Sequence, residues 1–157
     1  METLTAQPRR NDLFELHGSR DLFEEIKLAM VDYDSAPNSR LLLFLLFSLN
    51  HLPEWIAGES YERLKKRQDS GERLLPNQIF CLSLGQMQDF NTIRKLCNRS
   101  KHYKIQRGAI TSVTEGMTCD SPCTDSLDQV YYLIDGVDSR TILQSVMLEY
   151  HNWFASN

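Results

Sequence analysis

The sequence predicts a mainly α fold, a helical bundle of four to five helices with a small β-hairpin inserted before the C-terminal helix. Apolar residues recur at helical steps of three and four in several segments. This rhythm gives way to β-branched alternation only within residues 109–135, and it returns for the last segment. A length of 157 residues is that of one ordinary domain, so we expect a single domain over residues 1–157.

Composition narrows the class of protein. Apolar residues make up 41% of the chain and charged residues 24%, which is typical of a soluble globular protein. The net charge of −4 gives no long-range attraction to nucleic acid or anionic lipid, so any such binding must come from a local patch. The longest apolar run, residues 41–47, is far shorter than the roughly 20 residues that cross a bilayer. We therefore expect no membrane association.

Four cysteines, Cys81, Cys97, Cys119 and Cys123, are too few and too unevenly spaced for a disulfide scaffold. No secretory leader opens the sequence, which favours a cytoplasmic location. No phosphate-binding glycine loop and no convincing set of metal ligands is present, so we expect neither a cofactor nor a metal ion.

The first half of the chain is expected to be helical after a polar, flexible arm at residues 1–12. Ser19 is the predicted N-cap of a first helix that ends near Asp34. Asn38 or Ser39 is available to cap the next helix.

The second helix is expected to be the centre of the bundle. Residues 41–52 are apolar nearly all round, which in a soluble protein indicates a helix surrounded by others. A new helical turn is expected to start at Pro53. The charged segment 60–68 has helical periodicity but reads as an exposed extension or a mobile connection. After Pro76 the apolar pattern resumes, with Gly85 as a point of interruption.

The predicted hairpin lies between residues 109 and 135. Its strands are residues 109–115 and 129–134, with a long acidic loop, residues 116–128, between them. Asp135-Gly136 supplies turn chemistry, and Asp138 or Ser139 can cap the final helix. Because a two-stranded ribbon is marginal alone, we expect it to lean on the bundle or on a partner.

Reactive side chains crowd together in one stretch, residues 90–104. If this stretch is a helix, Phe90, Ile93, Leu96 and Cys97 share one face. Arg94, Asn98 and His102 follow one another at i, i+4 and i+8 on another face. One face is thus expected to pack and the other to face a ligand.

This stretch is also the basic part of the chain. Six Lys or Arg residues and no carboxylate lie in residues 94–107, whereas residues 115–138 hold six acids and no base. Crowded like charges favour neutral His102, the form that accepts a proton, and Asn98 can orient a substrate. The neighbouring cations could hold a phosphodiester: Arg94, Lys95, Arg99, Lys101 and Lys104. The alternative is a solvated helix end where cations are favoured by the dipole.

The run I-R-K-L-C-N-R-S-K-H-Y, residues 93–103, resembles the Asn-x-x-Lys-His signature of small bacterial and phage-associated helical proteins related to the HEPN superfamily. The run H-L-P-E-W-I, residues 51–56, and a last helix ending in Trp153 and Phe154 are similar to the same layout. The resemblance implies a helical bundle, a homodimer, and a place in a mobile-element or phage-defence system, with a cognate protein partner.

Catalytic HEPN proteins are metal-independent ribonucleases that use an arginine and a histidine with four to six residues between them. His102 matches that histidine, but no arginine has the required spacing from it. Lys95 occupies the most distant position that the spacing allows, Arg94 lies one position too far, and Arg99 lies too near. The resemblance therefore implies a catalytic set of His102, Asn98 and Lys95. The departure at the arginine favours a binding module over an enzyme.

Other constellations carry less chemistry. Cys119 and Cys123 read as two surface thiols, since a companion pair of zinc ligands is missing. Asp120, Asp125 and Asp128 lack the spacing of a calcium loop and are expected to solvate the turn. The i+4 spacing of His51 and Trp55 favours a packing pair at a helix end. Trp153 and Phe154 continue the apolar stripe of the last helix, which favours a role as core or dimer anchors.

Three functions stay open from the sequence. The first is a non-catalytic module that binds RNA or a nucleotide and acts in regulation. The second is a metal-independent endoribonuclease with toxin-like activity that uses His102 as its base. The third is a protein-interaction adaptor that uses the charged segment 61–73.

Overall fold

The computed structural model describes residues 13–101 and 108–157. These residues form six helices and one three-stranded antiparallel sheet, inserted before the last helix, so the mainly α prediction is confirmed. The count of helices exceeds the predicted four to five because the segment after Pro76 forms two helices. The predicted arm at residues 1–12 lies outside the described residues.

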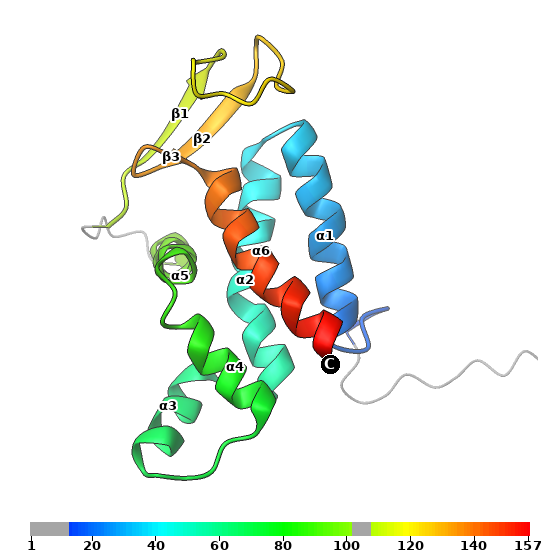
Figure 1. Cartoon of the computed structure of the whole chain (residues 1–157), viewed down its shortest axis with the longest axis vertical. Coiled ribbons are helices and arrows are strands. Elements are labelled where there is room, and N and C mark those ends of the chain that lie inside the picture. Colours follow the sequence, from blue (N-terminus) through cyan, green and yellow to red (C-terminus); the bar gives the residue numbers. More distant parts are fainter. Residues whose placement is uncertain (1–12, 102–107) are drawn as a thin grey trace, which may run out of the picture.

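The helices follow the chain in the order drawn in Figure 1. Their bounds are α1 Ser19–Ser35, α2 Ser39–Ala57, α3 Tyr61–Asp69, α4 Pro76–Leu84, α5 Gln88–Lys101 and α6 Ser139–Ser156. Helix α2 packs against α1, α4, α5 and α6, which confirms its predicted central place. Its buried face includes Leu45, Leu49 and Leu52, all without exposed surface, while Leu43 and Phe44 remain partly exposed.

Pro53 lies inside α2 and does not start a new turn, contrary to the sequence prediction. A proline has no N–H, so the carbonyl of Leu49 loses its usual i+4 donor. The hydroxyl of Tyr150, on α6, donates to that carbonyl at 2.7 Å in the core. Burial raises the pKa of Tyr150 well above its usual value, which keeps the hydroxyl a donor. A residue far along the chain thereby allows the helix to continue.

Local capping chemistry is confirmed at two of the three predicted helix starts. The Asn38 side chain accepts from the Leu41 N–H at 3.0 Å, and Asp138 accepts from the Arg140 N–H at 2.9 Å. Helix α1 differs, because Gly18 precedes it and Ser19 makes no capping bond. At that end Asp21 accepts instead from the backbone N–H of His17 at 2.8 Å.

The charged segment after α2 is a helix whose surface is mostly exposed, as predicted, but one buried residue packs it on the rest of the protein. Leu64 of α3 has no exposed surface and joins a small second core with Ala57, Cys81 and Leu82. Helix α3 packs on the protein through Leu64, because α4 lies beside it and covers this side chain. The sequence prediction missed this contact, since a single leucine gives no periodic signal.

The sheet has the order β1-β2-β3, with β1 Thr111–Glu115, β2 Val130–Ile134 and β3 Val137–Asp138. Strand β2 leans on the bundle through Ile134, which is 3% exposed, whereas every residue of β1 is exposed. Asp135 and Gly136 both have positive φ, as expected for the tight turn between β2 and β3. The prediction that the ribbon needs the bundle is confirmed for β2.

One acid of the loop between β1 and β2 does not solvate the turn. Asp125 accepts two bonds from the guanidinium of Arg140, at 3.0 and 2.8 Å, and a third from the Tyr131 hydroxyl. Asp138 completes the cluster from the start of α6. The Asp125 side chain is only 7% exposed, so the prediction of a solvated residue was wrong here. This loop is fastened to α6 by a buried ion pair.

The aromatic residues near the C-terminus pack into the core. Trp153 stacks on Phe80 with ring centroids 4.6 Å apart, and Phe154 stacks on Phe23 at 4.8 Å. These contacts confirm the core interpretation of the pair. In the described part of the chain no single helix is long and apolar enough to cross a membrane, although α2 and α3 taken together, with a 49° bend, would reach that length and apolarity.

Candidate functional site

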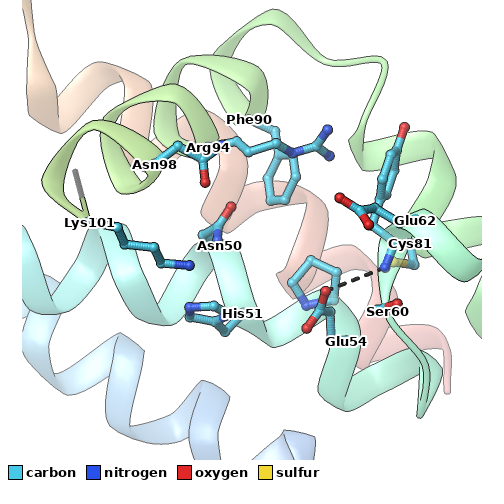
Figure 2. Close-up of a pocket in the computed structure, with 12 residues that line it drawn as sticks. Asn50, His51, Glu54, Ser60, Glu62, Cys81, Phe90, Arg94, Asn98 and Lys101 are labelled. Atoms are coloured by element: carbon cyan, nitrogen blue, oxygen red, sulfur yellow. Dashed lines mark hydrogen bonds between the residues drawn. The ribbon is translucent and has the colours of Figure 1, made fainter. Parts of the chain in front are cut away.

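A pocket of about 280 Å³ lies between α2 and α5, closed at one end by the start of α3. Helices α2 and α5 contribute four residues each, and α4 contributes one cysteine. The other three residues lie at the start of α3 and just before it. The lining residues are Asn50, His51, Pro53, Glu54, Ser60, Tyr61, Glu62, Cys81, Phe90, Arg94, Asn98 and Lys101. Figure 2 shows these side chains around the pocket.

Three of the residues predicted from the basic stretch line this pocket. Arg94, Asn98 and Lys101 lie on the same side of α5, as their spacing of four and three residues requires. The adjoining side of α5 buries Phe90, Ile93, Leu96 and Cys97 in the core, and Phe90 lies at the border between the core and the pocket. The two-faced helix that the sequence predicts is therefore confirmed over Gln88–Lys101.

The other predicted cations have different surroundings. Lys95 is exposed and is not among the residues that line the pocket. Arg99 donates from Nη1 to the carbonyl of Ala109 at 2.9 Å and lines a second, apolar groove beside the sheet. His102 and Lys104 lie outside the described residues.

Arg94 is held in place by aromatic rings. Its guanidinium carbon lies 4.1 Å from the centre of the Tyr61 ring and 5.3 Å from that of Phe90. Tyr61 can approach α4 this closely because Gly85 has no side chain, and a Cβ there would overlap the ring. The stack leaves the nitrogens of Arg94 to donate into the pocket.

The polar groups at one end of the pocket are left for a ligand. Within residues 13–101 and 108–157, the side chains of Asn50, His51, Asn98 and Lys101 form no hydrogen bond or ion pair with the protein. Figure 2 shows these four around the same end of the pocket. Asn50 and His51 are half-buried, whereas Asn98 and Lys101 are exposed. Half-buried polar groups usually have partners, so the lack of one at Asn50 and His51 points to a bound molecule or water.

Two acids line the other end of the pocket. Glu54 accepts a long bond from the Tyr61 N–H at 3.4 Å, while Glu62 is exposed. Figure 2 shows both on the side away from Lys101. The pocket is thus polarised, with amides, an imidazole and an ammonium at one end, and two carboxylates with the Arg94 guanidinium at the other. An anionic group is favoured more at the first end, where no carboxylate lies.

The cysteine of the pocket is held as the neutral thiol. Burial raises the pKa of the Cys81 thiol to about 11, with the Glu54 carboxylate acting in the same direction. The thiolate, which is the reactive form, is therefore scarce at neutral pH. In the part of the chain that the structure describes, no three His, Cys, Asp or Glu side chains come together to hold a metal ion.

Sequence reasoning missed the α2 side of the site. Asn50, His51 and Glu54 interrupt an otherwise apolar helix and share one face at steps of three and four. His51 was interpreted as packing on Trp55, but it lines the pocket and Trp55 does not. The sequence does contain an indication of this side of the site, because three polar residues near the end of an apolar helix need a polar environment. They form no local motif, so the pattern was not interpreted in this way.

Comparison of the chain with models of protein families, with curated proteins and with solved structures found no match.

Proposed function

We propose that this protein is a non-catalytic binding module for the phosphate group of a nucleotide, either free or within single-stranded RNA, and that it acts in regulation. The observation that carries the proposal is the set of donors at one end of the pocket that have no partner among the described residues. Asn50, His51, Asn98 and Lys101 face a common space from two helices. A mobile-element or phage-defence context, with a cognate protein partner, remains an expectation of the HEPN resemblance.

Each donor has a distinct role in the proposal. Lys101 supplies the charge that attracts a phosphate oxygen, and the amide groups of Asn50 and Asn98 donate hydrogen bonds. His51 donates one ring N–H when neutral and adds a charge when protonated. Arg94, stacked on Tyr61, lies farther along the pocket, where it can reach a second phosphate oxygen or stack beside a base.

Size and charge limit the ligand. A pocket of about 280 Å³ is at the small end of ligand sites, and it suits one nucleotide better than a stacked run of bases. The carboxylates of Glu54 and Glu62 oppose a second phosphate at the far end, but they can accept hydrogen bonds from the amino group of a base. The ligand is therefore one phosphate attached to a hydrogen-bonding base.

The test is a binding titration of the full chain against fluorescent mononucleotides and short single-stranded RNA at several salt concentrations. With one phosphate neutralised, the logarithm of the RNA association constant should fall with log salt at a slope of about −0.7. Lys101→Ala should weaken binding roughly tenfold and bring that slope closer to zero. Binding of RNA but not of mononucleotides would identify the polymer as the source of the phosphate.

Lys95→Ala is the matched control, since it removes a lysine from the same helix but outside the pocket. It should leave the affinity within about twofold of the native chain. The proposal is wrong if neither ligand binds, or if Lys95→Ala and Lys101→Ala weaken binding equally.

A metal-independent ribonuclease is the second candidate. What favours it is His51, an imidazole in the same pocket as Arg94 and Lys101, because proton transfer beside a held phosphate is the chemistry of 2′-hydroxyl attack. Labelled RNA incubated with the protein in EDTA should then be cut, and His51→Ala and His102→Ala separate the two histidines as bases. Uncut RNA under conditions where it is bound would exclude this candidate.

A further inference from the structure

Strand β1 is an open edge of the sheet. In the order β1-β2-β3, one side of β1 pairs with β2, and the described residues place no strand on the other side. All five residues of β1 are exposed, and none is a proline or a lysine. Natural sheets usually protect such edges with prolines, charged residues or a bulge, and β1 has only one of these, the Glu115 carboxylate at its end, so the rest of the edge is open to pairing.

The hydrogen-bond pattern shows which backbone groups are open. The Gly116 N–H donates to the Gln129 carbonyl at 3.0 Å, and the Asp135 N–H donates to the Ile110 carbonyl at 2.7 Å. Bonded and non-bonded pairs alternate in an antiparallel ladder, so the even-numbered residues of β1 bond to β2. Thr111, Val113 and Glu115 therefore direct their N–H and C=O groups away from β2.

We propose that β1 pairs with β1 of a second copy of this chain, antiparallel and across a two-fold axis at Val113. In that register Val113 faces its own counterpart, and Thr111 faces Glu115 of the second copy. Every outward group then meets an outward group, since all three residues belong to the open set. A two-fold interface needs this self-complementarity, and β1 has it without a like-charge pair.

Charge complementarity supports a second copy over another kind of strand. Arg99 lines the groove at the Thr111 end of β1, where Nη1 bonds to the Ala109 carbonyl. In the paired register, Glu115 of the second copy comes to lie opposite Thr111, next to this guanidinium. Neither Arg99 nor Glu115 forms an ion pair within the described residues.

The groove itself matches the face that pairing would cover. It has a volume of about 560 Å³ and runs along β1 between α2 and α5, lined by apolar residues that include Leu42, Leu43, Leu46 and Leu96. Val113 pairs with Tyr132 and points to the same side of the sheet as buried Ile134, so it faces the helices. Pairing would place Val113 of the second copy over the same groove and cover a residue that is now 58% exposed.

The test is sedimentation velocity of the full chain over a concentration series that reaches roughly 1 mM. Native protein should form a dimer. Val113→Pro removes an N–H that points away from β2 and leaves the hydrogen bonds between β1 and β2 in place. It should weaken the dimer roughly tenfold, with an unchanged circular dichroism spectrum. Thr114→Ala, on the other face of the same strand, should not alter association.

A charge exchange identifies the register. Glu115→Arg and Arg99→Glu should each weaken the dimer roughly threefold, and the double variant should restore it. A monomer at every concentration overturns the proposal, whether or not the edge binds a peptide strand. A dimer that tolerates Val113→Pro, or a double variant no better than its parents, also overturns it.

Discussion

The bond from Tyr150 to the carbonyl of Leu49 makes a sharp test of how α2 tolerates its proline. Tyr150→Phe keeps the ring in the core but removes the hydroxyl, which donates at 2.7 Å. Leu49 has no exposed surface, and Pro53 cannot supply the missing donor, so the carbonyl would be left without a partner. A buried unpaired acceptor costs about 1–3 kcal/mol. We expect Tyr150→Phe to lower the free energy of unfolding by about 2 kcal/mol.

The same substitution should cost less where residue 53 has an N–H. In a Pro53→Ala background, the new N–H can donate to the Leu49 carbonyl in the ordinary helical manner. Tyr150→Phe should then cost about 0.5–1 kcal/mol, which leaves a coupling energy of about 1 kcal/mol between the two positions.

Urea unfolding of the four proteins, followed by circular dichroism, measures this coupling directly. The slope of the unfolding free energy against urea should be the same in all four, so that the midpoints report stability. The reasoning is refuted if Tyr150→Phe costs the same in both backgrounds within about 0.5 kcal/mol.

Four further predictions concern other contacts. Asp125→Asn should cost about 2 kcal/mol, whereas Asp120→Asn and Asp128→Asn should stay within about 0.5 kcal/mol in the same urea experiment. Arg140 lowers the pKa of Asp125 in the folded protein. The loss of stability caused by Asp125→Asn should therefore have its full size above pH ~4 and should shrink as the pH falls through the folded-state pKa of Asp125. Leu64→Ala should lower the free energy of unfolding by about 3 kcal/mol, whereas Arg63→Ala should change it by no more than about 0.5 kcal/mol. The difference tests whether α3 is packed. Cys119 and Cys123 are free and exposed, so a thiol reagent should label them quickly, while Cys81 and Cys97, whose pKa values burial raises to about 11, should react only on unfolding. Gly85→Ala should displace Tyr61 and loosen the Arg94 stack, so nucleotide affinity should fall with little change in the pocket's lysine-dependent salt slope.

The candidate site was predictable only in part. Arg94, Asn98 and Lys101 could be grouped from their spacing, because residues on one helix keep fixed angular relations. Helical spacing alone does not separate Lys95 and Arg99 from this group, because they lie on neighbouring sectors of α5 and differ in what packs beside them. His51 and Asn50 were out of reach for local reasoning, since they join the site only when α2 lies against α5.

The sequence by itself determined the features that depend on near neighbours. The amphipathic stripes, the caps at Asn38 and Asp138 and the turn at Asp135 and Gly136 involve residues a few positions apart, so composition and spacing are sufficient. Tertiary structure alone decided the long-range pairs: Tyr150 with Leu49, Arg140 with Asp125, and the two helices of the pocket. These pairs depend on how each helix is rotated and placed against its neighbours. That placement is set by the packing of the whole core, which no short stretch of sequence contains.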